Sequence, residues 1–501
     1  METTPSYERS AERFEVALED VVKRYAVDTF ALSAVERMTH YRGRGTAILS
    51  VPHRVAQAIE ANCAYFRGHR SRRLDDVGYR QIANVFAAHP DRGLSRMLPE
   101  SLDVFMLYMF RQQMEIQRAF AQQDLARCQR LFMRGAPIPR LHEQFARKVG
   151  VSIPDWFKAG FCMYARASQG RNHSFLLEPP YVRGISVESH VIERYLKWAV
   201  SSPGQIGERY RRLRSEVSAK DHALIRTVFF SRPIIAYDER RHAAPFPHLI
   251  LHHAANELYE ILKGLDGFDQ EFGNAVENYV GFLLSQIPGA RIIGGRELRL
   301  HTDSHCDFLV ELSSEILLVE AKATSFTRNF LTERTIRSDG STRAISHGVD
   351  QLYASGQDLL NQKFAPLGIL AKGRPIHMVI ATFGHVALAN SPWYLETFIL
   401  DSCPTDPRLV AESAPSAPAV LSLPSLELLV AALCAGDSCA ALMKEKAELG
   451  FVRVGDWDTF LENRARDGAR CLPMSAAAQR DFQEFCDLLG TELQPCVGAD
   501  S

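Results

Sequence analysis

The sequence predicts an α/β protein in which a mixed β-sheet, flanked by helices, follows a mainly α-helical N-terminal region. Three observations support this fold class. Apolar residues recur at three- and four-residue steps through much of residues 1–230, and few alternating patterns interrupt them. Short apolar runs typical of strands follow after residue 300, with amphipathic segments on either side. A chain of 501 residues is too long to fold around a single hydrophobic core. We therefore expect an N-terminal region (1–230), a sheet domain (231–400) and a loop with a helical C-terminal extension (401–501).

The N-terminal region is expected to consist of helices separated by prolines. Helical spacing marks residues 15–25, 51–66, 101–120, 122–134 and 191–200. Residues 141–149, a Gly150-Val151-Ser152 break and residues 153–166 resemble the middle of a helix-turn-helix. The second segment contains Trp156 and Phe157, so an ordinary buried hairpin is favoured over a DNA-recognition helix.

Two basic clusters in this region are candidate surfaces for a phosphate backbone. The first comprises Arg67, His69, Arg70, Arg72 and Arg73, with Tyr79 and Arg80 just beyond, and the second comprises Arg209, Tyr210, Arg211, Arg212 and Arg214. For each cluster taken alone, a solvated helix face is the commoner outcome. We expect the region as a whole to bind either the substrate or a protein partner.

The remaining elements follow in order along the chain. Residues 231–247 contain three prolines and fit a connection. Helices are expected over 249–262, 271–286, 347–364, 426–446 and 475–490, strands over 308–310, 316–319 and 374–383, and loops over 324–346 and 401–424.

A hairpin centred on Ser313 and Ser314 sets the most informative spacing in the chain. Its antiparallel register places Asp307 opposite Glu320. Directly opposed residues have Cβ atoms about 4.5 to 5.5 Å apart, a separation that one divalent cation can bridge. Side chains alternate along a strand, so Glu320 and Lys322 share one face. A third carboxylate, Glu277, borders the apolar stripe of the helix over 271–286 and is expected to reach the same place, directly or through water.

A helical Glu, then Asp, then Glu-x-Lys on paired strands resembles the PD-(D/E)XK nuclease superfamily. The resemblance covers residues 246–384, and Cys306 stands where the family name has proline. It implies a restriction-endonuclease-like fold and hydrolysis of nucleic-acid phosphodiesters with Mg²⁺ or Mn²⁺. It also implies that Asp307 and Glu320 bind the metal, that Glu277 supports it, and that Lys322 orients the attacking water and stabilises charge on the phosphate. Restriction of foreign DNA and antiviral (phage) defence are settings associated with such nucleases, and cutting both strands often pairs two active sites in a homodimer.

Further polar residues are candidates for the same site. Gln351, on the helix over 347–364, is expected either to face the catalytic residues, as a polar residue does there in some relatives, or to be a solvated amide. The preceding loop carries arginines that either grip phosphates or are ordinarily solvated, namely Arg328, Arg334, Arg337 and Arg343. A zinc cluster is a minor alternative for His301, Asp303, His305 and Asp307, because their i, i+2 spacing suits a strand face equally well.

Composition narrows the function further. The formal net charge of −1 gives no global field for nucleic acid, so any binding surface is local. The ten cysteines form no CxxC pair, and no GxxxxGK[ST] phosphate loop is present. Residues 1–25 lack the apolar stretch of a signal peptide and no window resembles a membrane span, so we expect a cytoplasmic protein that does not enter a membrane.

The sequence therefore favours a metal-dependent nuclease acting on DNA in preference to RNA. The alternative is a nucleic-acid-binding or regulatory module that has a nuclease-like fold and does not cleave. A third possibility is an unrelated α/β scaffold in which Glu320 and Lys322 are surface residues.

Overall fold

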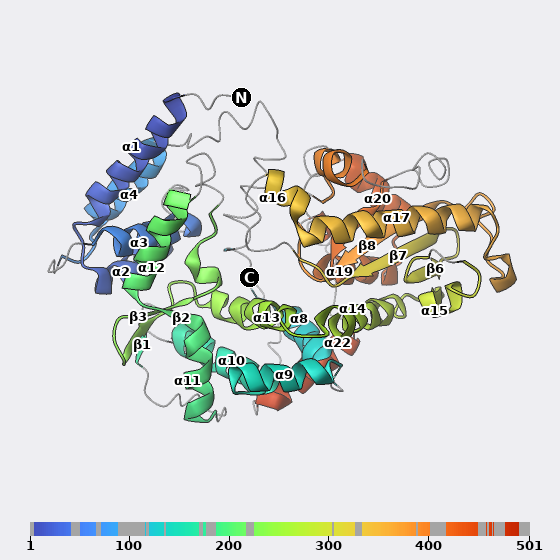
Figure 1. The fold of residues 1–501 in the computed structure, drawn as a ribbon, viewed down its shortest axis with the longest axis horizontal. Coiled ribbons are helices and arrows are strands. Elements are labelled where there is room, and N and C mark those ends of the chain that lie inside the picture. The colour runs from blue at the N-terminus through green and yellow to red at the C-terminus, as the bar shows by residue number, and fades with distance from the viewer. Residues whose placement is uncertain are drawn as a thin grey trace. The chain divides into compact units, whose positions relative to one another are not determined.

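A computed structural model of the protein describes residues 5–41, 51–66, 72–88, 116, 120–134, 137–169, 174–176, 187–216, 225–302, 305–325, 333–386, 389–400, 417–448, 457, 460–462, 464 and 476–489. The chain divides into two compact units (Figure 1). The first comprises Met1–Asp266 with Arg480–Ser501, and the second comprises Gly267–Gln479. The second unit thus begins later than the expected boundary at residue 231. It also continues past residue 400, because a strand and two helices from beyond that point complete it.

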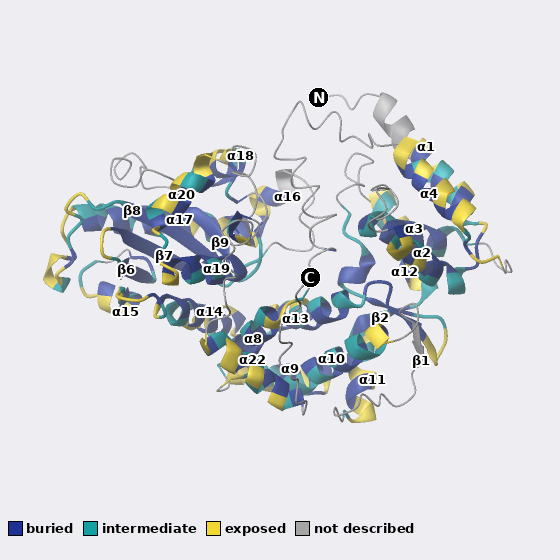
Figure 2. Cartoon of the chain, turned by 180° about the vertical axis from the view of Figure 1, so that it is seen from behind, coloured by how far each residue is buried: buried dark blue, intermediate teal, exposed yellow. Residues whose placement is uncertain are grey.

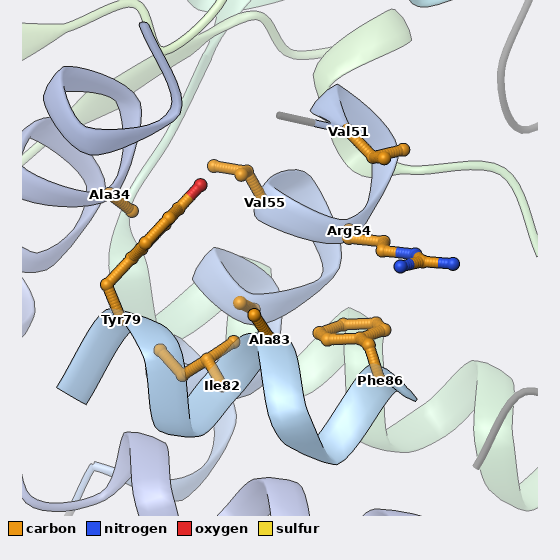
Figure 3. A pocket seen from close by; sticks show the side chains of 9 residues that line it. Ala34, Val51, Arg54, Val55, Tyr79, Ile82, Ala83 and Phe86 are labelled. Atoms are coloured by element: carbon orange, nitrogen blue, oxygen red, sulfur yellow. The ribbon is translucent and has the colours of Figure 1, made fainter. Parts of the chain in front are cut away.

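One part of the first unit is a group of helices around a shared core. These are α1 (Pro5–Val22), α2 (Val27–Tyr41), α3 (Pro52–Tyr65), α4 (Asp76–Ala88) and α12 (Pro203–Glu216). Helices α3 and α12 cross closely at Gly207, where an added Cβ would lie 2.9 Å from Ala64 Cα and also against the carbonyl oxygen of Cys63. A small apolar pocket lies between α2, α3 and α4, and the Arg54 guanidinium is 5.8 Å from the centre of the Phe86 ring at its edge (Figure 3).

The other helices described in this unit are α8 (Gln122–Cys128), the π-helix η3 (Gln129–Met133), α9 (Pro139–Val149), α10 (Ile153–Gln169), α11 (Ser189–Ala199), the 3₁₀-helix η6 (Val228–Phe230), α13 (His248–Lys263) and, from residue 480 onward, α22 (Ala476–Leu489). Gly150 ends α9 with φ at 86°, a left-handed conformation that suits glycine. Trp156 of α10 is fully buried, and its indole Nε1 donates to Ala254 O of α13 at 2.9 Å. The α9–α10 pair is therefore the buried hairpin that its apolar residues favoured.

The first unit also contains a small sheet that the sequence did not indicate. Its strands are β1 (Ser174–Leu176), β2 (Val200–Ser201), β3 (Ile234–Ala236) and β4 (Arg241–Ala243), in the order β1-β4-β3-β2. Each strand has only two or three residues, too few for an alternating pattern to be recognised. The predicted helix over 101–120 lies almost entirely outside the described residues.

The second unit is built on a five-stranded mixed sheet. The strands are β5 (Arg291–Gly294), β6 (Phe308–Glu311), β7 (Ile316–Lys322), β8 (Ile376–Thr382) and β9 (Ala419–Ser422), in the order β5-β6-β7-β8-β9. Strands β5, β6 and β7 pair antiparallel, whereas β7, β8 and β9 pair parallel. The central strands β7 and β8 are almost wholly buried (Figure 2). The expected mixed sheet flanked by helices is thus confirmed at this level.

Helices cover both faces of this sheet (Figure 1). They are α14 (Phe268–Leu284), the short α15 (Gly295–Leu298), α16 (Glu333–Ser338), α17 (Gly340–Leu360), the 3₁₀-helix η7 (Ala365–Leu367), α18 (Pro392–Tyr394), the π-helix η8 (Leu395–Ile399), α19 (Leu423–Cys434) and α20 (Cys439–Glu448). Gly281 of α14 meets the Phe308 ring, whereas Gly348 of α17 meets Glu320 and Lys322, so these two helices lie on opposite faces.

Three expectations for this unit were wrong in part. Helix α17 begins at Gly340 within the expected loop, because Asp339 caps it by accepting from the backbone N–H of Ser341 at 2.8 Å. Strand β9 lies inside the expected loop over 401–424, of which residues 401–416 are outside the description. The single helix expected over 426–446 is two helices, separated near Gly436, whose φ is 93°. No described helix has the length and apolar character that crossing a membrane requires.

Candidate active site

The β6–β7 hairpin has the predicted register. Phe308 pairs with Val319 and Glu311 with Ile316, which sets Asp307 beside Glu320 just before β6 begins. The two acidic residues are joined through the backbone. The N–H of Asp307 donates to Glu320 Oε2 at 3.1 Å, and Asp307 Oδ2 accepts from the N–H of Ala321 at 2.8 Å. The hairpin therefore brings both predicted carboxylates to one end of the sheet.

Lys322 lies in the same cluster. Its Nζ donates to Glu320 Oε1 at 2.6 Å and to Gln351 Oε1 at 2.8 Å. Gln351 in turn directs its Nε2 at the carbonyl oxygen of His305, 3.4 Å away. Of the two expectations for Gln351, contact with the catalytic candidates is the one found, and the amide holds the lysine from the side of α17.

Glu277 lies on the helix that covers the opposite face of the sheet from α17. It lies on α14 and is partly buried. Burial raises the pKa of Glu277, and the negative charge of Asp307 raises it further, whereas the positive charge of Arg299 opposes the shift. The negative charge of Asp307 thus acts on Glu277, whereas Glu320 and Lys322 contact α17 at Gly348.

Burial makes negative charge unfavourable at this site. Glu320 is only 2% exposed. Burial raises its pKa to about 7, with Asp307 contributing and Lys322 opposing. Burial also raises the pKa of Asp307, although the hydrogen bond from Ala321 and the charge of Lys322 oppose this. A cluster of carboxyl groups in this state attracts a cation or a proton.

Three residues of the site were not predicted as parts of it, and a fourth, His305, was named only in the zinc alternative. Gly348 allows α17 to approach, because an added Cβ would lie 3.2 Å from Lys322 Cε and 3.4 Å from Glu320 Cγ. Ser355 accepts from the backbone N–H of Cys306 at 2.7 Å. His305 and Arg299 bond to each other at 2.9 Å beside Asp307 and Glu277. Gly348 and Ser355 lie three residues before and four residues after Gln351, so all three share one face of the helix. This helical spacing could have identified Gly348 and Ser355 from the sequence.

Cys306, at the position where the family name has proline, is a buried thiol. Burial, together with the charge of Glu320, raises its pKa to about 12. The thiol therefore stays protonated near neutral pH, as expected of a packing residue.

The zinc alternative is not supported by the described residues. His305 has both ring nitrogens in hydrogen bonds, at 2.9 Å to Arg299 and 3.0 Å to Cys306 O, and Asp303 lies outside the description. In the described ranges, no three His, Cys, Asp or Glu side chains are gathered closely enough to hold a metal ion.

Two of the four loop arginines, Arg337 and Arg343, have described side chains. Arg328 and the side chain of Arg334 are outside the described residues. Arg337 donates to Thr397 O at 3.0 Å and stacks over Phe398. Arg343 is exposed on α17.

Most described members of the two basic clusters have protein partners. Arg72 pairs with Asp75, Arg73 with Glu36, and Arg80 with the Tyr41 hydroxyl. In the second cluster the arginines are engaged as follows: Arg209 with Arg226 O, Arg211 with Ala64 O, Arg212 with Glu216, and Arg214 with Glu15. These contacts are those of structural or solvated side chains. They do not support the interpretation of either cluster as a surface that binds a phosphate backbone. Residues 67–71 lie outside the description.

Comparisons of this chain with protein-family models, with curated proteins and with solved structures found no match.

Proposed function

We propose that this protein is a metal-dependent nuclease that hydrolyses phosphodiester bonds of DNA, on a restriction-endonuclease-like fold of the PD-(D/E)XK superfamily. The observation that carries the proposal is the convergence of Asp307, Glu320, Lys322 and Gln351 at the end of one hairpin, through contacts of 2.6 to 3.1 Å. These four residues are up to 44 positions apart in the sequence. Together they supply two carboxylates, an ammonium group and an amide, which are the kinds of group that metal-assisted phosphodiester hydrolysis uses.

The donor set fits a hard divalent cation. Asp307 and Glu320 would hold Mg²⁺ or Mn²⁺, with Glu277 in support, because all three offer carboxylate oxygens. The raised pKa values of these carboxyl groups mean that nearby positive charges and hydrogen bonds do not fully offset the cost of burying their negative charge. A bound cation would supply the missing positive charge. When bound, such a cation would neutralise the phosphate and make water a better nucleophile.

The residues of the chain itself have distinct tasks in this proposal. Lys322 is held between Glu320 and Gln351 and supplies positive charge to the phosphate and an N–H donor to the attacking water. Gln351 holds the lysine through a second hydrogen bond, at 2.8 Å. The backbone bond from Ala321 orients the Asp307 carboxylate through Oδ2.

Cleavage of supercoiled plasmid and linear duplex DNA tests the proposal. We expect cleavage with Mg²⁺ or Mn²⁺ but not with chelator, and loss of about 100-fold or more in rate for Lys322→Ala and Asp307→Asn. Matched controls are Lys444→Ala, which alters a lysine whose side chain is 78% exposed, and Asp269→Asn, which alters an exposed aspartate at the start of α14. Full activity in both site variants would exclude this site.

A second function is favoured by one observation. Among the described residues, no three His, Cys, Asp or Glu side chains are grouped closely enough to hold a metal ion. The Glu320 carboxylate is instead paired with Lys322 at 2.6 Å. A module that binds nucleic acid without cutting it is compatible with this arrangement. Chelator-insensitive binding, with no cleavage of DNA or RNA by any divalent metal, would identify that module.

A further inference from the structure

An arginine next to the carboxylates is held in place by a histidine of fixed tautomer. Arg299 follows α15 and is exposed, whereas His305 is buried. His305 Nδ1 lies 3.0 Å from the carbonyl oxygen of Cys306, which can only accept, so Nδ1 carries the proton. Nε2 is then the acceptor of the 2.9 Å bond that Arg299 Nε donates. With these two partners, the imidazole donates through Nδ1 and accepts through Nε2.

The histidine is fixed on more than one side. The backbone N–H of the next residue, Cys306, is anchored at 2.7 Å to Ser355 of α17. An added Cβ at Gly295 would lie 3.5 Å from His305 Cε1, so α15 packs directly against the ring. His305 is thus a rigid acceptor that joins the chain before β6 to α15.

The guanidinium is left with its outer nitrogens available. Within the described parts of the chain, Arg299 bonds through Nε, and neither Nη group donates to a protein acceptor. Its positive charge nevertheless acts on Glu277 and on Asp307. Two Nη groups on a fixed guanidinium form the fork that binds phosphate oxygens in a bidentate manner.

We propose that Arg299 binds a backbone phosphate of the nucleic-acid substrate and that His305 is the positioning residue that aims it. The inference rests on the proposed function, because it assigns the phosphate to a strand held at the same carboxylate cluster. It adds a cationic contact that the Glu-x-Lys pattern does not contain.

Binding without cleavage tests the role of Arg299. The probe is a fluorescently labelled DNA duplex titrated in chelator over a range of salt concentrations. We expect Arg299→Ala to weaken binding about tenfold. The slope of log affinity against log salt should also become shallower by about one. Arg296→Ala removes an exposed arginine from the same short helix and is expected to bind like wild type.

Three variants test the role of His305. His305→Phe keeps the ring and removes the acceptor, so affinity is expected to fall toward that of Arg299→Ala. His305→Gln places an amide oxygen near the Nε2 position and is expected to recover most of the affinity. Because the histidine acts through the arginine, Arg299→Ala with His305→Phe is expected to bind no worse than Arg299→Ala alone. An additive loss in the double variant would overturn the positioning role.

Nitrogen NMR of histidine and arginine side chains examines the link independently of any nucleic acid. We expect a protonated Nδ1 on His305, and slow exchange of the Arg299 Nε–H that His305→Phe accelerates. An Nε2-protonated imidazole would contradict the inference even in a protein that folds normally. Unchanged affinity and salt slope in Arg299→Ala would overturn the phosphate contact alone. If wild-type protein binds neither duplex nor single-stranded probes, both this inference and the proposed function fail.

Discussion

Glu320 is a buried acid whose charge has an energetic cost in the folded protein. Burial raises its pKa from 4.5 to about 7. A carboxyl group whose folded pKa lies above its unfolded value contributes stability below the unfolded pKa, and this contribution is lost as pH rises through the folded value. Without metal, the window of loss therefore runs from about 4.5 to about 7.

We expect Glu320→Gln to become more stable relative to wild type across this window. The difference in unfolding free energy should grow by as much as about 3 kcal/mol between the acidic and the alkaline end, because one pKa unit corresponds to about 1.4 kcal/mol. Urea unfolding in chelator at a series of pH values measures it. Glu297→Gln, which neutralises an exposed glutamate on α15, is the control without this pH dependence. Parallel curves for wild type and Glu320→Gln would contradict the prediction.

The site residues that could be predicted from the sequence are those whose relative positions follow from a single local rule of secondary structure. Asp307 and Glu320 follow from a hairpin register, and Lys322 follows from strand alternation. His305 and Arg299 were not predictable as a pair, because their bond depends on how α15 folds back against the chain before β6. Arg299 follows a short helix and His305 precedes a strand, so the repeat of neither element relates the two residues.

At the scale of elements, the approach of α17 to the sheet depends on Gly348. An alanine Cβ would lie 3.2 Å from Lys322 Cε and 3.4 Å from Glu320 Cγ, so Lys322 must shift by a few tenths of an ångström. Alanine favours the helix over glycine by about 1 kcal/mol, and overpacking costs about 1 to 3 kcal/mol, so the two effects largely offset each other.

We therefore expect Gly348→Ala to change stability by less than about 2 kcal/mol while reducing the cleavage rate at least about tenfold, since small displacements of a catalytic group are costly. Urea unfolding and plasmid cleavage measured on the same preparation test this. The control is Gly273→Ala on α14, where an added Cβ meets nothing within 4 Å, and we expect it to leave cleavage unchanged. Normal cleavage by Gly348→Ala would show that the site tolerates displacement of Lys322.

The turn of the same hairpin anchors a C-terminal helix. Glu315 is 4% exposed and accepts from the first backbone N–H groups of α20, at 2.8 Å each from Cys439 and Ala440, and from His377 at 3.0 Å. Burial acts to raise the pKa of Glu315, but the bonds from His377 and the helix outweigh it and leave the pKa lowered. Stability from this carboxylate is therefore present above the unfolded pKa and lost as pH falls through the folded value.

We expect Glu315→Gln to destabilise the second unit by about 2 to 3 kcal/mol near neutral pH, because an amide has one acceptor oxygen for three donors. The loss should shrink as pH falls below the ordinary glutamate value of 4.5. Thermal unfolding at neutral and acidic pH measures both statements. The same loss at both pH values would mean that the carboxylate charge is not responsible.

Elements with long repeats were predictable, and elements defined by tertiary partners were not. The hairpin, α13, α14 and β8 lie close to their expected bounds. Strand β9 has four residues and becomes a strand by pairing with β8, and β2 has two residues and pairs with β3. The start of α17 depends on a cap at Asp339, within a polar segment that was expected to be a loop.

At the scale of the whole molecule, the second unit is inserted in the chain of the first. Residues 267–479 separate the body of the first unit from its final helical residues. The sequence suggested an extension from residue 401 onward, since nothing in a local pattern indicates which core a late helix joins. Asp481 of α22 attaches this late helix to the first unit through two ion pairs. It is 2% exposed and bonds to Arg130 Nε at 2.6 Å and Arg134 Nη1 at 2.5 Å.

We expect the two units to unfold in separate calorimetric transitions, and Asp481→Ala to lower only that of the first unit. Removing a buried partner of an ion pair costs about 3 to 5 kcal/mol, and the partial exposure of Arg130 and Arg134 reduces this to about 2 to 3 kcal/mol. Gly207→Ala, which crowds the α3–α12 crossing, identifies the first transition, and Glu315→Gln identifies the second. Asp487→Ala removes an exposed carboxylate from the same helix and is expected to shift neither by more than about 0.5 kcal/mol. If Asp481→Ala lowers both transitions equally, the inserted unit and its host unfold as one cooperative structure.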